Sequence, residues 1–178
     1  MITLEELNES DNNIDSLPDM SKFTNLKILN ISNNTITSLI PISEQKGSGV
    51  FWKSTIKVSG PNTLPPKLNY LNVSNNKLKH ITFYDLPKSL KTIDISFNNF
   101  TELSTTNFNN LTLIYISDDM EKFFNLNDIR YNNAHEEIKF ITNKSPSTSL
   151  TDIYNVATSI GSGKTILQGL NRRSVSKR

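Results

Sequence analysis

Glycine and lysine residues near the end of the sequence have the composition of a phosphate-binding loop. Gly161-Ser162-Gly163-Lys164-Thr165 matches the second half of the pattern G-x-x-x-x-G-K-S/T. In that loop, backbone N–H groups hold phosphates, the lysine contacts the outer phosphates and the hydroxyl binds magnesium. Thr158 stands where the first glycine is needed, and only 13 residues (178 − 165) follow Thr165, too few for the large parallel sheet around such a loop. We therefore expect a flexible turn at Gly161–Thr165 and keep nucleotide binding as an alternative.

Other residues that could carry catalysis are few. His80 and His135 are the two histidines of the chain, and neither lies in a cluster with metal-ligand spacing. The chain has no cysteine, which excludes thiol chemistry, and its serines do not form a nucleophile-elbow motif. We therefore expect a protein that is not an enzyme, with no catalytic residue, no bound metal and no cofactor.

An eleven-residue pattern recurs along the chain, and the elements that it builds must position whatever residues carry the function. The pattern is L-x-x-L-x-L-x-x-N-x-L, in which other aliphatic residues or phenylalanine replace some leucines. It occupies residues 26–36, 68–78 and 90–100, and weaker copies begin at Leu4 and Leu111. Such a period indicates stacked repeats, each of which forms one strand and one return segment.

The spacing of the copies predicts six repeat units. Most neighbouring copies start 21 or 22 residues apart, but Leu26 and Leu68 are 42 residues apart, close to twice the period. We therefore predict an irregular third unit between them, whose strand directs Ile56 and Val58 into the core. Because alternate side chains of a strand face opposite ways, one face of every strand would build that core. A single repeat buries too few aliphatic side chains to offset its ordering entropy, so only the stack is stable.

Residues 4–121 resemble leucine-rich repeat proteins, particularly the short type with repeats of 20–22 residues. The Leu-Pro pairs, such as Leu17-Pro18 and Leu64-Pro65, are also similar to repeats of bacterial, amoebal and large-virus families. The resemblance implies an α/β, β-dominated solenoid, a right-handed superhelix with a parallel concave sheet. It also implies a non-catalytic scaffold that binds other proteins. Glu9 at an inward position and Asp119 at an asparagine position depart from the pattern.

The asparagine of each copy stands where the chain leaves the strand. A side-chain amide carries both donors and an acceptor, so stacked asparagines can satisfy the backbone groups of buried turns. We predict a structural asparagine ladder formed by Asn12, Asn34, Asn76 and Asn98. Asp119 holds this position in the last copy, and because a carboxylate has no donors, the ladder should stop there.

Between the inward-facing residues, alternate residues of each strand should face the concave side of the sheet. Exposed apolar and aromatic groups on a rigid sheet suit protein recognition. The residues that we predict to contact a protein partner are Ile28, Asn30, Tyr70, Asn72, Thr92, Asp94 and Tyr115. A third row of small serines should serve close packing. The alternative is a structural or decoy repeat of an expanded family, without a dedicated partner.

The repeat boundaries divide the chain into three parts. We predict leucine-rich repeats in residues 1–121, a C-terminal cap in 122–142, and a flexible linker with a basic tail in 143–178. The first copy is rich in acidic residues, so we expect it to act as its own polar cap; the alternative is that another chain covers it. Trp52 follows a glycine-rich break in the pattern and either fills the core there, which we favour, or lies exposed at an interface.

The amino-acid composition bears on the compartment and the partners of the protein. The absence of cysteine favours a reducing compartment, and the sequence starts with no signal peptide, so we expect a cytoplasmic protein. No stretch approaches the roughly 20 apolar residues of a membrane span. The net charge is +2, and five of the basic residues lie from Lys164 onward, where there is no acidic residue. No nucleic-acid-binding motif accompanies this charge, so we do not expect a nucleic-acid partner. We expect a monomer that binds another protein.

Overall fold

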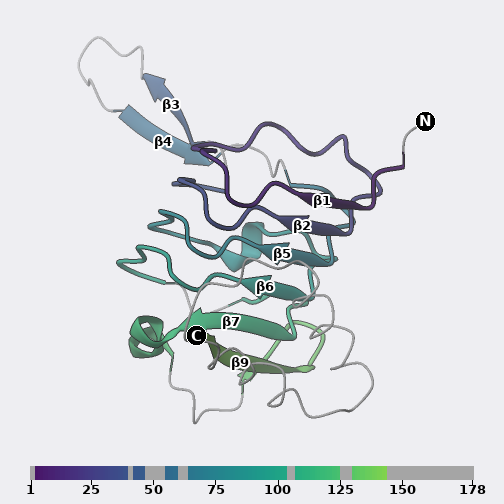
Figure 1. The fold of residues 1–178 in the computed structure, drawn as a ribbon. Helices are drawn as coiled ribbons and strands as arrows, with labels where there is room; N and C mark the ends of the chain where they lie inside the picture. The colour runs from purple at the N-terminus through teal and green to yellow at the C-terminus, as the bar shows by residue number, and fades with distance from the viewer. Residues whose placement is uncertain are drawn as a thin grey trace, which may run out of the picture. The chain divides into compact units, whose positions relative to one another are not determined.

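The computed structural model describes residues 3–39, 42–46, 55–59, 64–103, 107–124 and 130–143. Most of its strands form one seven-stranded sheet in the order β1-β2-β5-β6-β7-β9-β8 (Figure 1). These strands are β1 (Glu6–Asn8), β2 (Ile28–Asn30), β5 (Tyr70–Asn72), β6 (Thr92–Asp94), β7 (Leu113–Ser117), β8 (Arg130–Tyr131) and β9 (Glu137–Asn143). All neighbours pair in parallel except β8 and β9. Within the described ranges, the helices are two 3-10 helices, η1 (Phe83–Asp85) and η2 (Asp118–Phe123).

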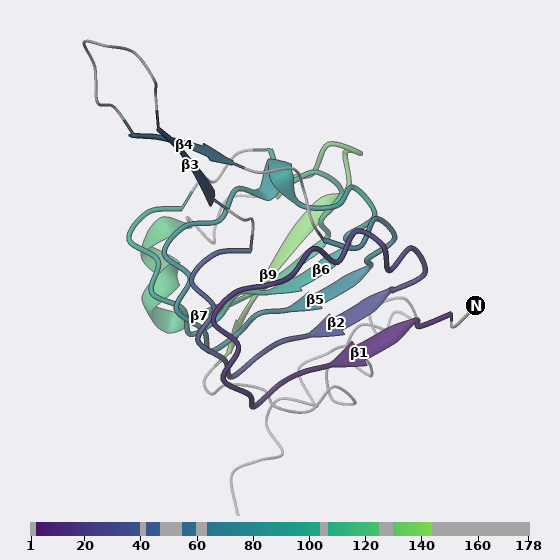
Figure 2. The same ribbon diagram turned by 90° about the horizontal axis from the view of Figure 1, so that it is seen from above.

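The strands pair so that equivalent residues of successive repeats are neighbours. Leu29 pairs with Leu71, and Leu71 with Ile93, as the repeat predicts. These side chains are fully buried in one core, together with aliphatic residues of the return segments such as Ile36 and Leu78. Figure 2 shows the strands of the sheet along one side and return segments across from them. The predicted parallel-sheet solenoid is therefore confirmed, with little helix.

The predicted third unit is wrong. Ile56 and Val58 lie in β4 (Thr55–Ser59), which pairs antiparallel with β3 (Ile42–Lys46) in a separate two-stranded sheet. Strand β2 pairs directly with β5, so β3 and β4 contribute no strand to the solenoid sheet. The sequence gives a physical reason, because the repeat register would place Lys53 at the first leucine position and Pro61 at the asparagine position. Neither could fill the core or bond the turn.

The asparagine ladder joins each repeat to the one before it. Asn76 Nδ2 donates to the carbonyls of Val73 and Ser74 in its own repeat and to that of Ile31 in the preceding repeat, at 2.9–3.2 Å. Its Oδ1 accepts from the Ile36 N–H at 3.0 Å. The buried residues that make this set of bonds are Asn34, Asn76 and Asn98. Each one thus satisfies four backbone groups that the turn leaves in the interior.

The ladder has an end at each side of the stack. Asn12 is exposed and donates only to the Ser10 carbonyl and to the Glu9 carboxylate, because no repeat precedes it among the described residues. Asp119 is exposed and accepts from the Ser117 hydroxyl at 2.6 Å. The prediction that the ladder stops at Asp119 is confirmed, whereas Asn12 belongs to the ladder by position and not by its bonds.

A second column of turn residues has left-handed backbone geometry. Asp11, Asn33, Asn75 and Phe97 lie at equivalent positions and have φ between 51° and 59°. Asn33 Nδ2 donates to Asp11 Oδ1 at 3.0 Å, and Asn75 Nδ2 donates to Asn33 Oδ1. Asparagine and aspartate tolerate this geometry, but a bulky aromatic residue does not. Phe97 is therefore a point of backbone strain in the turn after β6.

We expect the substitution Phe97→Asn to raise the free energy of unfolding by about 1 kcal/mol. Asparagine would relieve the strain and extend the column of side-chain bonds. Chemical denaturation measures the change, and Asn75→Phe, the reverse exchange one repeat earlier, should cost a similar amount. A Phe97→Asn variant that is less stable than the wild type would show that packing of the phenylalanine outweighs the strain.

The segment after β7 covers the last repeat. The Phe140 ring lies 4.7 Å from the Phe124 ring and 6.3 Å from the Phe108 ring, measured between centroids. Asn143, which we placed in the tail, is instead the buried last residue of β9. The rest of the predicted tail, the Gly161–Thr165 loop and Trp52 lie outside the described residues.

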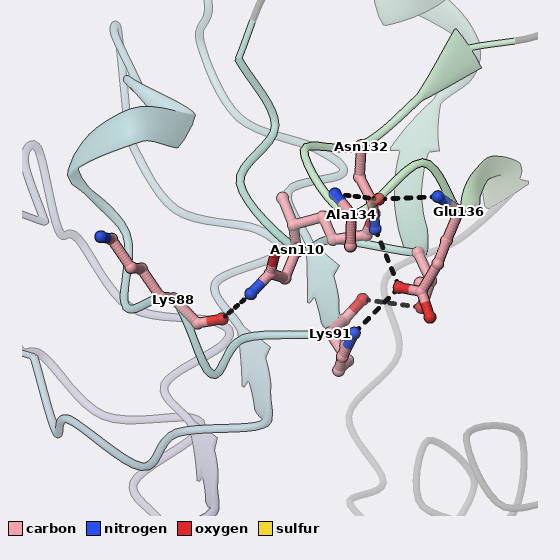
Figure 3. A network of polar contacts seen from close by, with 8 residues as sticks. Lys88, Lys91, Asn110, Asn132, Ala134 and Glu136 are labelled. Carbon is pink, nitrogen blue, oxygen red and sulfur yellow. Dashed lines mark hydrogen bonds and ion pairs between the residues drawn. The ribbon is translucent and has the colours of Figure 1, made fainter.

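A polar network fixes the turn that leads into β9 (Figure 3). Asn132 Oδ1 accepts from the N–H groups of Ala134 and Glu136, both at 2.9 Å, and its Nδ2 donates to the Glu136 carboxylate. Lys91 forms an ion pair with the same carboxylate at 3.0 Å and, with Asn132, lowers the pKa of Glu136. The cap is thus attached to the repeat that contains β6.

Candidate functional site

The predicted contact residues form two rows across the sheet. One row joins Ile28, Tyr70, Thr92 and Leu113, and the other joins Asn30, Asn72, Asp94 and Tyr115, each residue paired with the next. The core residues of the strands lie between the two rows in sequence, so both rows face away from the core. The structure therefore brings all seven predicted residues together on one face. Whether a partner binds there stays a prediction.

The expectation that these side chains are exposed is wrong. Tyr70 is 4% exposed and Tyr115 is 5% exposed, and the other five are buried as well. The exposed members lie toward the ends of the rows: Glu6 and Asn8 in β1, and Lys139 in β9, which pairs with Leu113. The strands β2, β5, β6 and β7 each have a strand on both sides, about 4.8 Å away, and these lateral neighbours contribute to the burial, whereas β1 has a neighbour on one side only.

The asparagines of the second row have a structural role that the sequence analysis missed. Asn30 Oδ1 accepts from the Ser32 N–H at 3.1 Å, and Asn72 Oδ1 accepts from the Ser74 N–H at 2.9 Å. This bond between a side chain and the backbone two residues later closes the strand end. The signal in the sequence was the recurrence of Asn-x-Ser, as at Asn30-Ile31-Ser32 and Asn72-Val73-Ser74. We assigned a role in close packing to the serines and did not predict the bond from the asparagine side chain.

Several buried polar atoms on this face have no hydrogen-bond partner among the described residues. They are the Nδ2 atoms of Asn30 and Asn72, the hydroxyls of Tyr70 and Tyr115, and the hydroxyls of Ser32 and Ser74. An unsatisfied buried donor or acceptor costs about 1–3 kcal/mol. The face thus carries donors in neighbouring strands that a group with acceptor oxygens could satisfy.

Asp94 departs from the asparagine row and is the centre of a small polar cluster. Its Oδ1 accepts from the Ser96 N–H at 3.0 Å and the Ser96 hydroxyl at 2.6 Å, and its Oδ2 accepts from Asn143 Nδ2 at 3.0 Å. Burial nevertheless raises the pKa of Asp94 from 3.8 to about 6, because the hydrogen bonds only partly offset the loss of hydration. Asn143 is 49 residues away in sequence, so no local signal could have revealed this contact.

The two tyrosines stay protonated near this carboxylate. Burial, and then the charge of Asp94, raises the pKa of both Tyr70 and Tyr115 well above 10. Their hydroxyls are therefore hydrogen-bond donors at physiological pH. A buried carboxylate next to donors that no described residue accepts is an environment suited to binding.

No group of three or more histidine, cysteine, aspartate or glutamate side chains in the described ranges could hold a metal ion. None of the helices in the described part of the chain has the length and apolar composition needed to cross a bilayer.

The fold is a parallel β-solenoid in which each turn contributes one strand, and the turns after β2, β5 and β6 each contribute one buried ladder asparagine. The Leucine Rich Repeat family matches residues 25–45 and 89–111. The protein is therefore a leucine-rich repeat protein with repeats of about 22 residues. No curated protein matches the chain. Leucine-rich repeats are generally non-catalytic scaffolds that present an extended concave surface for binding.

Proposed function

We propose that the protein is a non-catalytic scaffold that binds another protein through the concave face of its sheet. The observation that carries this proposal is the set of unpaired donors on that face. Asn30, Tyr70, Asn72 and Tyr115 each hold a buried polar atom that has no partner in the described part of the chain. Carbonyl oxygens of a partner polypeptide would satisfy such donors, and relieving this cost would contribute to affinity.

The burial of these side chains has a kinetic consequence for the proposal. A partner reaches them only after a rearrangement that opens access, and association that requires such a change is slower than ordinary docking. We therefore expect the observed association rate to level off at high partner concentration. Stopped-flow fluorescence with a partner identified by proximity labelling measures this, and a rate that rises linearly would contradict access by rearrangement.

The hydroxyl groups of the two tyrosines provide a direct test. The double substitution Tyr70→Phe/Tyr115→Phe removes only the unpaired oxygen atoms, so we expect the fold to be as stable as the wild type or more stable by about 1 kcal/mol. Binding of the partner should weaken about tenfold or more, because each hydroxyl would lose a hydrogen bond to the partner. Affinity is measured by calorimetry and stability by chemical denaturation.

Two exposed tyrosines serve as the matched control. Tyr84 is 63% exposed and Tyr131 is 60% exposed, and neither belongs to the two rows. The variant Tyr84→Phe/Tyr131→Phe should bind the partner as the wild type does. If both double variants keep full affinity, the concave face is not the binding site, whatever the partner.

A further inference from the structure

The end of the solenoid that contains β1 leaves core positions uncovered. Leu4, Leu7, Ile14 and Leu17 are only partly buried. Their equivalents one repeat later, Leu26, Leu29, Ile36 and Leu39, are between 0 and 4% exposed. The same contrast holds in the turn before the strand, where Phe23 is 40% exposed and its equivalent Phe108 is 4% exposed. An acidic repeat alone therefore does not complete the cap that we expected there, and apolar surface remains.

The backbone of β1 has an open edge. Within the sheet, β1 pairs with β2 alone. The carbonyls of Asn30, Asn72 and Asp94 each accept from the N–H of the residue that directly follows the preceding strand, at 2.8–2.9 Å. The equivalent carbonyl in β1 is that of Asn8, which receives no bond from any described residue. Backbone groups alternate along a strand, so the Glu6 N–H faces the same open edge.

This edge is strongly acidic. Residues 3–25 contain six acidic residues and one basic residue, Lys22. Glu5 forms an ion pair with Lys27 at 3.0 Å. The remaining carboxylates, all exposed, are those of Glu6, Glu9, Asp11, Asp15 and Asp19. Charges at an edge keep identical strands apart, so two copies of this end would repel each other, while a basic chain would be attracted.

We propose that the open edge of β1 is a second protein-binding site, which accepts a basic, extended polypeptide segment as an added strand. The segment would bond the Glu6 N–H and the Asn8 carbonyl as the other strands bond their neighbours. Its apolar side chains would cover Leu4 and Leu7, and its lysine or arginine side chains would lie near the carboxylates. This site uses the backbone at the open edge of β1, whereas the proposed concave-face site uses side chains of β2, β5, β6 and β7.

The probe is a fluorescein-labelled synthetic peptide in which lysine alternates with valine, titrated by fluorescence anisotropy against the full chain. We expect saturable binding in the micromolar range that weakens as salt is raised. A peptide of the same sequence with alternate amides methylated cannot pair as a strand and should bind at least about tenfold more weakly. This comparison needs no protein variant, so it holds even where a variant fails to fold.

Protein variants separate the backbone contribution from the charge. Glu6→Pro places a ring where the outward N–H lies, whereas Glu6→Ala keeps that N–H and removes the same charge. We expect Glu6→Pro to bind about tenfold more weakly than Glu6→Ala. Glu6→Lys/Glu9→Lys should weaken binding at low salt, and Glu102→Lys/Glu137→Lys, an equal charge change at exposed residues away from β1, should not.

Each outcome bears on the proposal. Equal binding of the methylated and unmethylated peptides, or equal affinity of Glu6→Pro and Glu6→Ala, would overturn strand addition. Binding that is unchanged by Glu6→Lys/Glu9→Lys would overturn the requirement for a basic segment. A concentration-dependent dimer by sedimentation, abolished by Glu6→Pro, would assign the edge to a second copy and overturn the proposal. Peptide binding that survives Tyr70→Phe/Tyr115→Phe separates this site from the concave face.

Discussion

Replacing Asn76 by leucine is expected to lower the free energy of unfolding by about 3 kcal/mol. The side chain is 6% exposed and forms four hydrogen bonds with backbone groups of two repeats. Leucine has a similar size, so the loss would come from leaving the carbonyls of Ile31, Val73 and Ser74 and the N–H of Ile36 without this partner. Chemical denaturation with a check for a single transition measures the change.

The control for this substitution is Asn12→Leu, which changes the same position of the first repeat. Asn12 is exposed, and its amide bonds only groups of its own repeat. Water can replace those bonds, so the expected loss is less than about 1 kcal/mol. An equal loss in the two variants would mean that bonding between repeats is not what makes the ladder stabilising.

The sequence predicted the solenoid because its constraints repeat. The aliphatic residues that must face inward and the asparagine that must bond the turn recur at one spacing, so the strand register follows from alignment of the copies. The pairs that this alignment gives, such as Leu71 with Ile93 and Asn72 with Asp94, are the pairs of the structure. Both predicted rows of the concave face follow from the same alignment.

Features that depend on a single, non-repeated contact could not be predicted in this way. Strands β3 and β4 pair with each other where the repeat spacing predicted one more strand of the solenoid. The reason is that Lys53 stands at a core position of the repeat and Pro61 at the asparagine position, and neither fits there. Our prediction gave more weight to the spacing than to those two residues. The bond from Asn143 to Asp94 joins two strands, β9 and β6, that lie on either side of β7. Nothing in the local sequence of either residue indicates it.

Replacing Asp94 by asparagine is expected to stabilise the protein at neutral pH. Burial raises the pKa of Asp94 from 3.8 to about 6, so the folded state holds the proton more tightly than the unfolded state. The stability linked to this proton is complete below pH 3.8 and is lost as the pH rises through about 6. The difference between the two pKa values corresponds to about 3 kcal/mol. The variant should therefore gain about 1 to 3 kcal/mol at pH 7.5 and nothing below pH 4.

The gain is expected to stay below its upper bound because the Asn143 amide must turn over to offer its oxygen to the new amide. Denaturation curves at several pH values test the prediction, with Asn72→Asp as the control. That substitution places a carboxylate at the equivalent position in β5, which is also buried, and should destabilise the protein above pH 6 and not below pH 4. A wild type whose stability is flat between pH 4 and 7 would contradict the raised pKa.

A gain in stability from Asp94→Asn would also bear on the proposed binding site. It would mean that the wild-type protein keeps, at neutral pH, a charge that opposes its own folding. That charge lies on the face that we propose to bind a partner, and asparagine at this position would give a more stable fold. Binding would then be the reason for the carboxylate, and Asp94→Asn should weaken it while strengthening the fold.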